Sequence, residues 1–98
     1  MSNKPLLLIV DDDPLISDSL SHAFAAEFDI VTSHARPHCL ALLRQLRQTP
    51  QVALVDLGLP PQPHRPDEGF ALIGELLAHA PEMKIIVLSG QNGDDNAR

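Results

Sequence analysis

The sequence predicts an α/β fold, a doubly wound parallel sheet with helices on both faces. Short apolar runs alternate with segments whose apolar residues recur at helical spacing. The runs at 6–10, 52–55 and 85–88 are apolar throughout, as expected of strands covered on both faces. Two of these runs end directly in aspartate, and in such sheets ligands bind beyond the carboxyl ends of the strands.

The first half of the chain predicts two strands and two helices. Leu6–Val10 is the first strand, and Asp13 with Pro14 marks the start of a helix as its N-cap and first turn. Apolar side chains recur along this helix at Ile16, Leu20, Ala23 and Phe24. A short strand follows near Ile30–Thr32. Pro37 is expected to open a second helix, with one face formed by Cys39, Leu43 and Leu46. Thr49-Pro50 ends it.

The second half predicts strand, helix and strand. Val52–Val55 is a strand that ends in Asp56, and a proline-dense loop follows it. The next helix is expected over about 70–80, ended by Pro81, with one face formed by Ile73, Leu76, Leu77 and Ala80. Lys84–Leu88 is the fourth strand, followed by Ser89-Gly90.

The fourth strand has no polar alternation, which is typical of a central strand rather than an edge. We therefore expect a further strand beside it. The chain of 98 residues is expected to be a single domain, 1–98, that is incomplete at its C-terminal end. The alternative is that a second copy supplies the missing strand, in a homodimer formed by strand exchange or pairing.

Composition excludes several classes of protein. The net charge of -6 with only seven Lys and Arg argues against direct nucleic-acid binding and is compatible with a cation or a basic partner. The single cysteine, Cys39, cannot form an internal disulfide and is expected to be a small buried apolar residue. The apolar run at 6–10 is too short for a signal peptide or membrane span, so we expect a cytoplasmic protein with no membrane contact.

Acidic side chains at the predicted strand ends indicate a cation site. Asp11 and Asp12 follow the first strand and Asp56 ends the third, so all should meet at one edge of the sheet. Clustered carboxylates repel each other unless a cation neutralises them, and such oxygens suit Mg²⁺. Asp56 can also act as a nucleophile, and Ser89 can donate to a phosphoryl oxygen. The alternative for Asp11–Asp13 alone is a solvated acidic turn with a helix cap.

Four segments in this order resemble the receiver domains of two-component response regulators: LLIVDDDP, VALVDLGLP, EGF (68–70) and KIIVLSG. The resemblance extends from Leu6 to Gly90. It implies a flavodoxin-like (CheY-like) fold with strand order 2-1-3-4-5. It also implies that a sensor histidine kinase donates a phosphoryl group to Asp56, and that the domain catalyses no reaction besides its own phosphorylation and dephosphorylation.

The resemblance assigns a role to each site residue. Asp12 and Asp56 would be direct Mg²⁺ ligands, Asp11 would act through water, and Gly58 would contribute its backbone carbonyl. Ser89 would be the switch hydroxyl that meets the phosphoryl group. The lysine that follows the family's fifth strand has no counterpart in this chain, since Lys84 begins the fourth strand at the opposite end.

The loop over 60–68 is about five residues longer than the resemblance leads one to expect. Its prolines should make it an ordered flap beside Asp56 that contacts the kinase or influences the metal site. The alternative is a tolerated surface insertion. Such a loop resembles receivers of sigma-54-dependent (NtrC-like) regulators linked to PEP-CTERM and exopolysaccharide systems. That likeness implies an ATPase and DNA-binding output module and a role in transcription.

Two other functions compete with a phosphorylated receiver. A pseudo-receiver would use the fold for protein interaction without phosphorylation. A Mg²⁺-dependent phosphohydrolase would need a second acid two residues after Asp56, where Gly58 stands. The five histidines show no ligand spacing on one helix face and are expected at solvated positions: His22, His34, His38, His64 and His79.

Overall fold

The computed structural model describes residues 4–88, which form a parallel four-stranded sheet with the order β2-β1-β3-β4. The strands are β1 (Leu6–Val10), β2 (Asp29–Ser33), β3 (Val52–Asp56) and β4 (Lys84–Leu88). The helices are α1 (Pro14–Phe24), α2 (Arg36–Gln45) and α3 (Asp67–His79). The predicted fold class and strand order are therefore confirmed.

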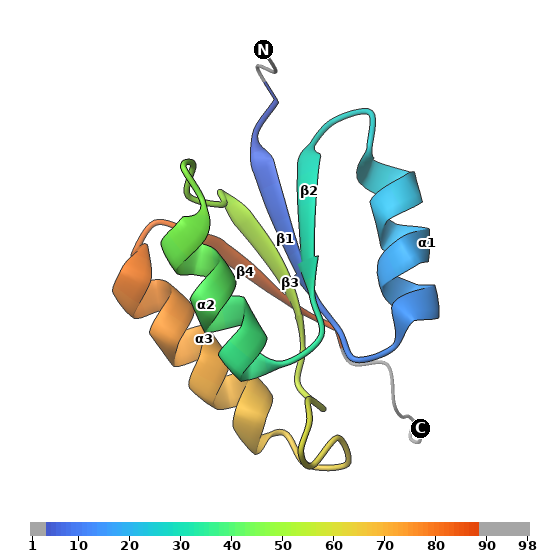
Figure 1. The fold of residues 1–98 in the computed structure, drawn as a ribbon, viewed down its shortest axis with the longest axis vertical. Coiled ribbons are helices and arrows are strands. Elements are labelled where there is room, and N and C mark those ends of the chain that lie inside the picture. Colours follow the sequence, from blue (N-terminus) through green and yellow to red (C-terminus); the bar gives the residue numbers. More distant parts are fainter. Residues whose placement is uncertain (1–3, 89–98) are drawn as a thin grey trace.

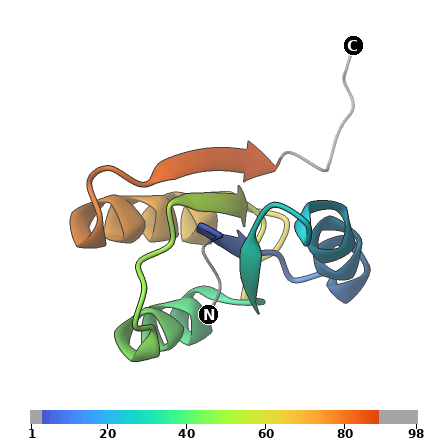
Figure 2. The same ribbon diagram turned by 90° about the horizontal axis from the view of Figure 1, so that it is seen from above.

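The sheet separates two apolar layers. α2 and α3 lie on one face and α1 lies on the other (Figures 1 and 2). On the α2–α3 face, Leu8, Val10 and Val55 of the sheet pack with Leu43 and Leu72. The face towards α1 is formed by a second set: Leu7, Ile9 and Leu54, with Leu20, Phe24 and Phe28 packed against them. Because β1 contributes to both layers, all five of its residues are buried.

Local signals determine where the helices begin. The Asp13 side chain accepts a hydrogen bond from the backbone N–H of Leu15, at 3.0 Å, and Pro14 stands in the first turn. α2 also has a proline in its first turn, Pro37, as predicted. α3 begins at Asp67, three residues before the predicted Phe70, with acidic residues in the first turn that favour a helix N-terminus.

Two predicted helix faces are confirmed in part. On α1, Leu20 and Phe24 pack against the sheet as predicted, but Ile16 is 40% exposed and its neighbour Ser17 is buried instead. On α3, Leu76 is buried, with Ile73 and Ala80 packed beside it, but Leu77 is 39% exposed and the unpredicted Leu72 is fully buried. The face predicted for α2 is confirmed, because Cys39 and Leu43 are buried and Leu46 packs against them.

β4 is the outer strand of the sheet within residues 4–88, with Ile86 and Val87 half exposed. The expected further strand and Ser89 lie outside the described residues. Among the residues described, no helix combines the length and the apolar character needed to cross a membrane.

Candidate phosphoacceptor and metal site

The three predicted acids meet at one edge of the sheet. β1 pairs with β3 in parallel, with Val10 opposite Val55, so the residues that follow lie side by side. Each of Asp11, Asp12 and Asp56 contributes a carboxylate oxygen that lies within 4.8 Å of the other two. We call this group the acid triad. Its assembly was predicted from the strand ends.

Asp11 is the most deeply placed member of the triad, since only 4% of it is exposed. Its Oδ1 accepts a hydrogen bond from the backbone N–H of Asp13 at 2.9 Å. Its own N–H donates to the carbonyl oxygen of Ser33 at 3.0 Å, which joins the site to the end of β2. Asp12 is half-buried and Asp13 is exposed as the helix cap. The three consecutive aspartates therefore occupy three different environments.

Asp56 is held by the turn that follows β3. Its Oδ1 accepts a hydrogen bond from the backbone N–H of Gly58 at 3.0 Å, so the carboxylate has one preferred orientation. Gly58 is buried. Its carbonyl oxygen, the predicted ligand, belongs to the same turn, and its role as a ligand stays a prediction.

Gly69 allows α3 to approach this turn closely. A Cβ atom at residue 69 would lie 2.3 Å from the Cα of Leu57, which no real side chain tolerates. The N–H of Gly69 also donates to the carbonyl oxygen of Leu57 at 3.2 Å. In the sequence, Gly69 stands out only as part of the EGF segment. The tertiary structure shows why a glycine is required there, because the backbones of residues 69 and 57 are in close contact beside Asp56.

Burial and mutual repulsion make the triad hard to ionise fully. Desolvation is the main cause that raises the pKa of Asp56 to about 6, and the charges of Asp11 and Asp12 add to it. A hydrogen bond with Asp11 also favours a proton on Asp56. The pKa of Asp11 is raised as well, chiefly by desolvation. A cation among these oxygens would offset both the desolvation of the carboxylates and the repulsion between them.

The donor set of the triad fits Mg²⁺. The ligand atoms are hard carboxylate oxygens, close enough together to contact one ion, and Mg²⁺ is usually held by one or two carboxylates. Asp12, which is half-buried, has room to keep water in the coordination sphere.

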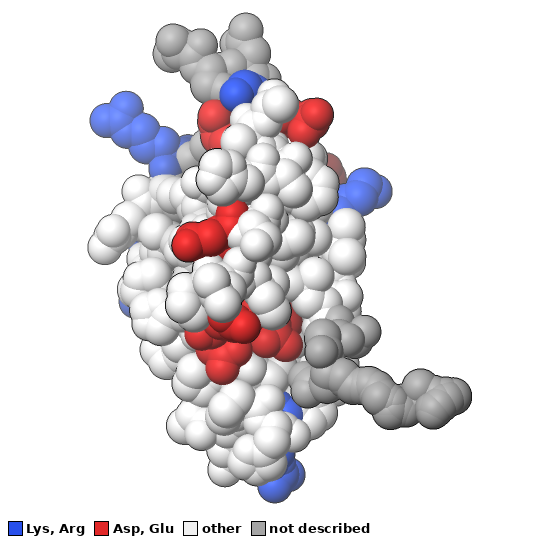
Figure 3. All heavy atoms as spheres, turned by 90° about the vertical axis from the view of Figure 1, so that its right-hand side faces the viewer, with Lys and Arg blue, Asp and Glu red and all other residues white. Residues whose placement is uncertain are grey.

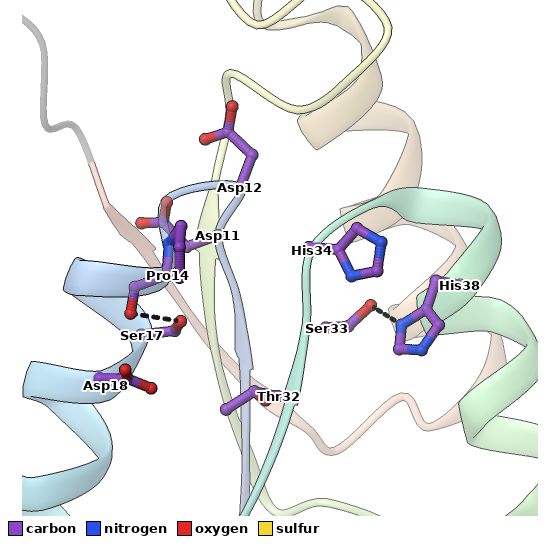
Figure 4. Close-up of a pocket in the computed structure, with 9 residues that line it drawn as sticks. All are labelled: Asp11, Asp12, Pro14, Ser17, Asp18, Thr32, Ser33, His34 and His38. Atoms are coloured by element: carbon purple, nitrogen blue, oxygen red, sulfur yellow. Dashed lines mark hydrogen bonds between the residues drawn. The ribbon is translucent and has the colours of Figure 1, made fainter.

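A groove of about 500 Å³ opens beside the triad between α1 and the end of β2. Figure 4 shows Asp11 and Asp12 on one side of it and Ser33, His34 and His38 on the other. Acidic residues gather on the face of the molecule that carries α1, with Lys and Arg at its margins (Figure 3). This distribution favours a cation over an anion in the groove.

The long loop over 60–66 is built from turns and lies beside Asp56. Backbone hydrogen bonds join Gln62 to Leu59 and Arg65 to Gln62. The loop forms one wall of a partly open pocket of about 220 Å³, whose lining includes Gly58, His64 and Leu88. The prediction of an ordered flap next to Asp56 is consistent with this arrangement, and its contact with a kinase stays a prediction.

An ion-pair network that the sequence analysis missed connects α2 to α3. The Arg36 guanidinium donates to both carboxylate oxygens of Glu75, at 2.7 and 3.0 Å, and its third nitrogen lies 3.3 Å from Glu68. Such pairs carry no local signal, because the partners are 39 and 32 residues apart. The network anchors the first turn of α3, which follows the long loop.

The comparisons with known proteins agree with this geometry. The family model of the response regulator receiver domain matches residues 7–98. The chain belongs to the response regulator receiver family. The receiver resemblance inferred from the sequence is thereby confirmed at the level of the family, and the sigma-54-dependent, PEP-CTERM-associated subtype remains a prediction.

The receiver is similar to several known proteins. It is 31% identical over 98 residues to the transcriptional regulatory protein AruR of Pseudomonas aeruginosa, covering 96% of this chain but only 38% of the relative. A CheY-like receiver domain protein from Methanospirillum hungatei has a TM-score of 0.77 and 27% identity, with 93% of this chain and 68% of that chain covered. A Burkholderia pseudomallei response regulator, solved with a phosphorylated aspartic acid and a calcium ion, shares the fold at a TM-score of 0.75 and 23% identity, over 91% and 49% of the chains.

Proposed function

We propose that this receiver is a phosphoacceptor in which Asp56 takes a phosphoryl group from the phosphohistidine of a sensor histidine kinase. The observation that carries the proposal is the convergence of Asp11 and Asp12 on the nucleophile Asp56, whose orientation is set by Gly58. A domain used only for interaction has no need of buried, mutually repelling acids.

The metal in this proposal is Mg²⁺, with Asp12, Asp56 and the Gly58 carbonyl as direct ligands and Asp11 acting through water. When bound, Mg²⁺ supplies positive charge that offsets the charge of the triad and of the phosphoryl oxygens. The raised pKa values of Asp11 and Asp56 support this arrangement, because burial and the neighbouring carboxylates oppose their ionisation and a bound cation would favour it.

The transfer step needs Asp56 in its ionised form. One carboxylate oxygen attacks the phosphorus, the phosphorus–nitrogen bond of the phosphohistidine breaks, and the leaving imidazole keeps the electron pair and takes up a proton. The product is an acyl phosphate on Asp56. The Gly58 N–H limits rotation of the carboxylate, which reduces the entropy lost on reaching the attack geometry.

The output is proposed to be transcriptional. This rests on the 31% identity to a transcriptional regulatory protein, of which the present chain spans 38% of the length. A sigma-54-type ATPase with a DNA-binding module is the finer form of this proposal, and it rests on the long loop after Asp56.

Exposure of the protein to Mg²⁺ and acetyl phosphate tests the proposal directly. Intact-mass spectrometry should show the addition of one phosphoryl group, dependent on Mg²⁺ and absent in Asp56→Asn. Glu27→Gln, at an exposed acid between α1 and β2, is the matched control and should label like the unmodified protein. A folded protein that gains no mass would instead be a pseudo-receiver, and steady release of inorganic phosphate from a generic phosphomonoester would favour the phosphohydrolase.

A further inference from the structure

The first turn of α3 is not placed by the chain that leads into it. Residues 57–66 separate the end of β3 from the start of α3. The hydrogen bonds that Gln62 and Arg65 donate stay within this loop, since their acceptors are Leu59 and Gln62. A longer connection restricts the relative position of its two ends less than a short one does. Contacts from outside the loop therefore hold this turn of α3 in place.

Gly69 connects the position of α3 to the phosphoacceptor. Its N–H donates to the carbonyl oxygen of Leu57 at 3.2 Å, and a Cβ atom at residue 69 would lie 2.3 Å from the Cα of Leu57. The next residue of the same turn, Gly58, donates its N–H to Oδ1 of Asp56 at 3.0 Å. Because the two backbones are in direct contact, a shift of the first turn of α3 would displace the turn that orients the Asp56 carboxylate.

Arg36 holds this turn of α3 from the neighbouring helix. It is the first residue of α2, and α2 and α3 run side by side on the same face of the sheet (Figure 1). One guanidinium nitrogen lies 3.3 Å from a carboxylate oxygen of Glu68, the residue before Gly69. Two nitrogens donate to Glu75, two helical turns further on, at 2.7 and 3.0 Å. Bidentate pairs of this kind impose a defined geometry in addition to their energy.

The network differs from an ordinary pair of charges on the surface. The side chains are partly buried, with exposed fractions of 32% for Arg36, 25% for Glu68 and 37% for Glu75. Isolated exposed ion pairs contribute little, whereas bidentate geometry and membership of a network are the exceptions. The hydrogen bond from Arg36 is the main cause that lowers the pKa of Glu75, so this pair is charged at neutral pH. Within residues 4–88, no other ion pair joins α2 to α3.

We propose that Arg36 is a positioning residue for the phosphoacceptor Asp56, acting through the first turn of α3. Its guanidinium bonds to carboxylates of α3 rather than to the acid triad, so its effect on the reaction is indirect. The inference rests on the proposed phosphorylation of Asp56 and adds that the rate of this step depends on the contact between α2 and α3. The carboxylate must be held in an attack geometry, so a small displacement of its turn slows the transfer.

The first test measures the rate of phosphorylation by intact-mass spectrometry, at saturating Mg²⁺ and a fixed concentration of acetyl phosphate. Arg36→Ala should lower the rate constant about tenfold or more, because a misplacement of about 1 Å caused far from the chemistry can cost about a hundredfold. Glu75→Gln should act in the same direction, and the double variant should be no slower than Arg36→Ala, because both changes remove the same contact. Arg44→Ala removes an exposed positive charge from the same helix and is the matched control, which should keep the rate of the unmodified protein.

The second test needs neither metal nor phosphodonor. In NMR spectra recorded with EDTA, the Gly58 amide resonance of Arg36→Ala should shift and the amide should lose protection against hydrogen exchange, whereas Arg44→Ala should leave both unchanged. A role of Arg36 in global stability alone would not change the Gly58 amide shift of the folded protein. If the unmodified protein took up no phosphoryl group, the proposed function would fail, and the Gly58 amide would still report on Arg36.

The inference is overturned if the Gly58 amide of folded Arg36→Ala behaves as in Arg44→Ala. It is also overturned if a protein that is phosphorylated shows equal rates in these two variants. The remaining amide resonances establish whether each variant is folded. If Arg36→Ala does not fold, Arg36→Lys replaces it, because lysine keeps the charge but has a single nitrogen for the two carboxylates. The same changes in rate and in the Gly58 amide are expected for Arg36→Lys.

Discussion

Replacing Asp56 by Asn should stabilise the metal-free receiver at neutral pH. The carboxylate is half-buried beside Asp11 and Asp12, and its ionisation is opposed by desolvation and by both neighbouring charges. Asn keeps the shape of the side chain and can still accept the hydrogen bond from the Gly58 N–H. It lacks the charge, so the cost of ionisation in the folded state disappears.

The magnitude follows from the pKa of Asp56, which rises from 3.8 to about 6 on folding. Each pKa unit corresponds to about 1.4 kcal/mol, so the upper limit is about 3 kcal/mol. Solvent screening of a half-buried group lowers this, and we expect a gain of about 1–2 kcal/mol in the free energy of unfolding.

The direction of the Asp56 pKa shift on folding determines how stability depends on pH. Because the folded-state pKa is the higher one, the folded protein holds more protons than the unfolded chain between the two values. The stability that protonated Asp56 contributes is fully present below pH 3.8 and is lost as the pH rises through about 6. The gain in unfolding free energy from Asp56→Asn should therefore be large at pH 7.5 and small near pH 4.

Urea unfolding with EDTA, followed by circular dichroism at the two pH values, measures the effect. Glu27→Gln removes one exposed negative charge between α1 and β2, outside the groove, and serves as the control. Added Mg²⁺ should stabilise the unmodified protein more than Asp56→Asn, since the variant lacks a ligand. Equal stability of Asp56→Asn and the unmodified protein at pH 7.5 would refute the reasoning, as would an equal gain in Glu27→Gln.

Three further predictions concern the surroundings of the site. Asp13→Ala should lower the free energy of unfolding by about 1 kcal/mol, because the helix loses its cap. Its Mg²⁺ affinity, measured by titration, should be unchanged because Asp13 is outside the triad. Gly69→Ala should destabilise the fold by about 1–3 kcal/mol in urea unfolding, because the new Cβ overpacks against Leu57. Gly74→Ala on the same helix has open space around it and should instead raise the free energy of unfolding by up to about 1 kcal/mol. Cys39 should react with iodoacetamide far more slowly in the folded protein than in urea, because burial raises its pKa to about 11 and excludes the reagent; equal rates would contradict this.

Local sequence signals were sufficient to predict the two strands that carry the site, the aspartates that follow them and the helix cap at Asp13. Strands β1 and β3 are continuous apolar runs, so their positions and the aspartates after them could be identified without a structure. Asp13 and Pro14 form a local cap whose geometry involves only neighbouring residues. Parallel strands bring their carboxyl ends to one edge, and the acid triad follows from that rule.

Helix orientation could not be predicted as well, because apolar residues are more numerous than the inward stripe requires. On α3, spacing alone allows a stripe through Leu77 as readily as one through Leu72. Contact with the sheet decides between them, since Gly69 must face Leu57 and this rotation turns Leu72 inward. On α1, the same kind of choice places Ser17 inward and leaves Ile16 exposed.

The sequence by itself determined the fold class, the strand ends and the identity of the acids, because each depends on periodicity or on adjacent residues. Only the tertiary structure decided which distant side chains meet. The ion pair between Arg36 and Glu75, 39 residues apart, depends on how α2 packs beside α3. Such contacts form through space between segments whose relative placement no local pattern encodes.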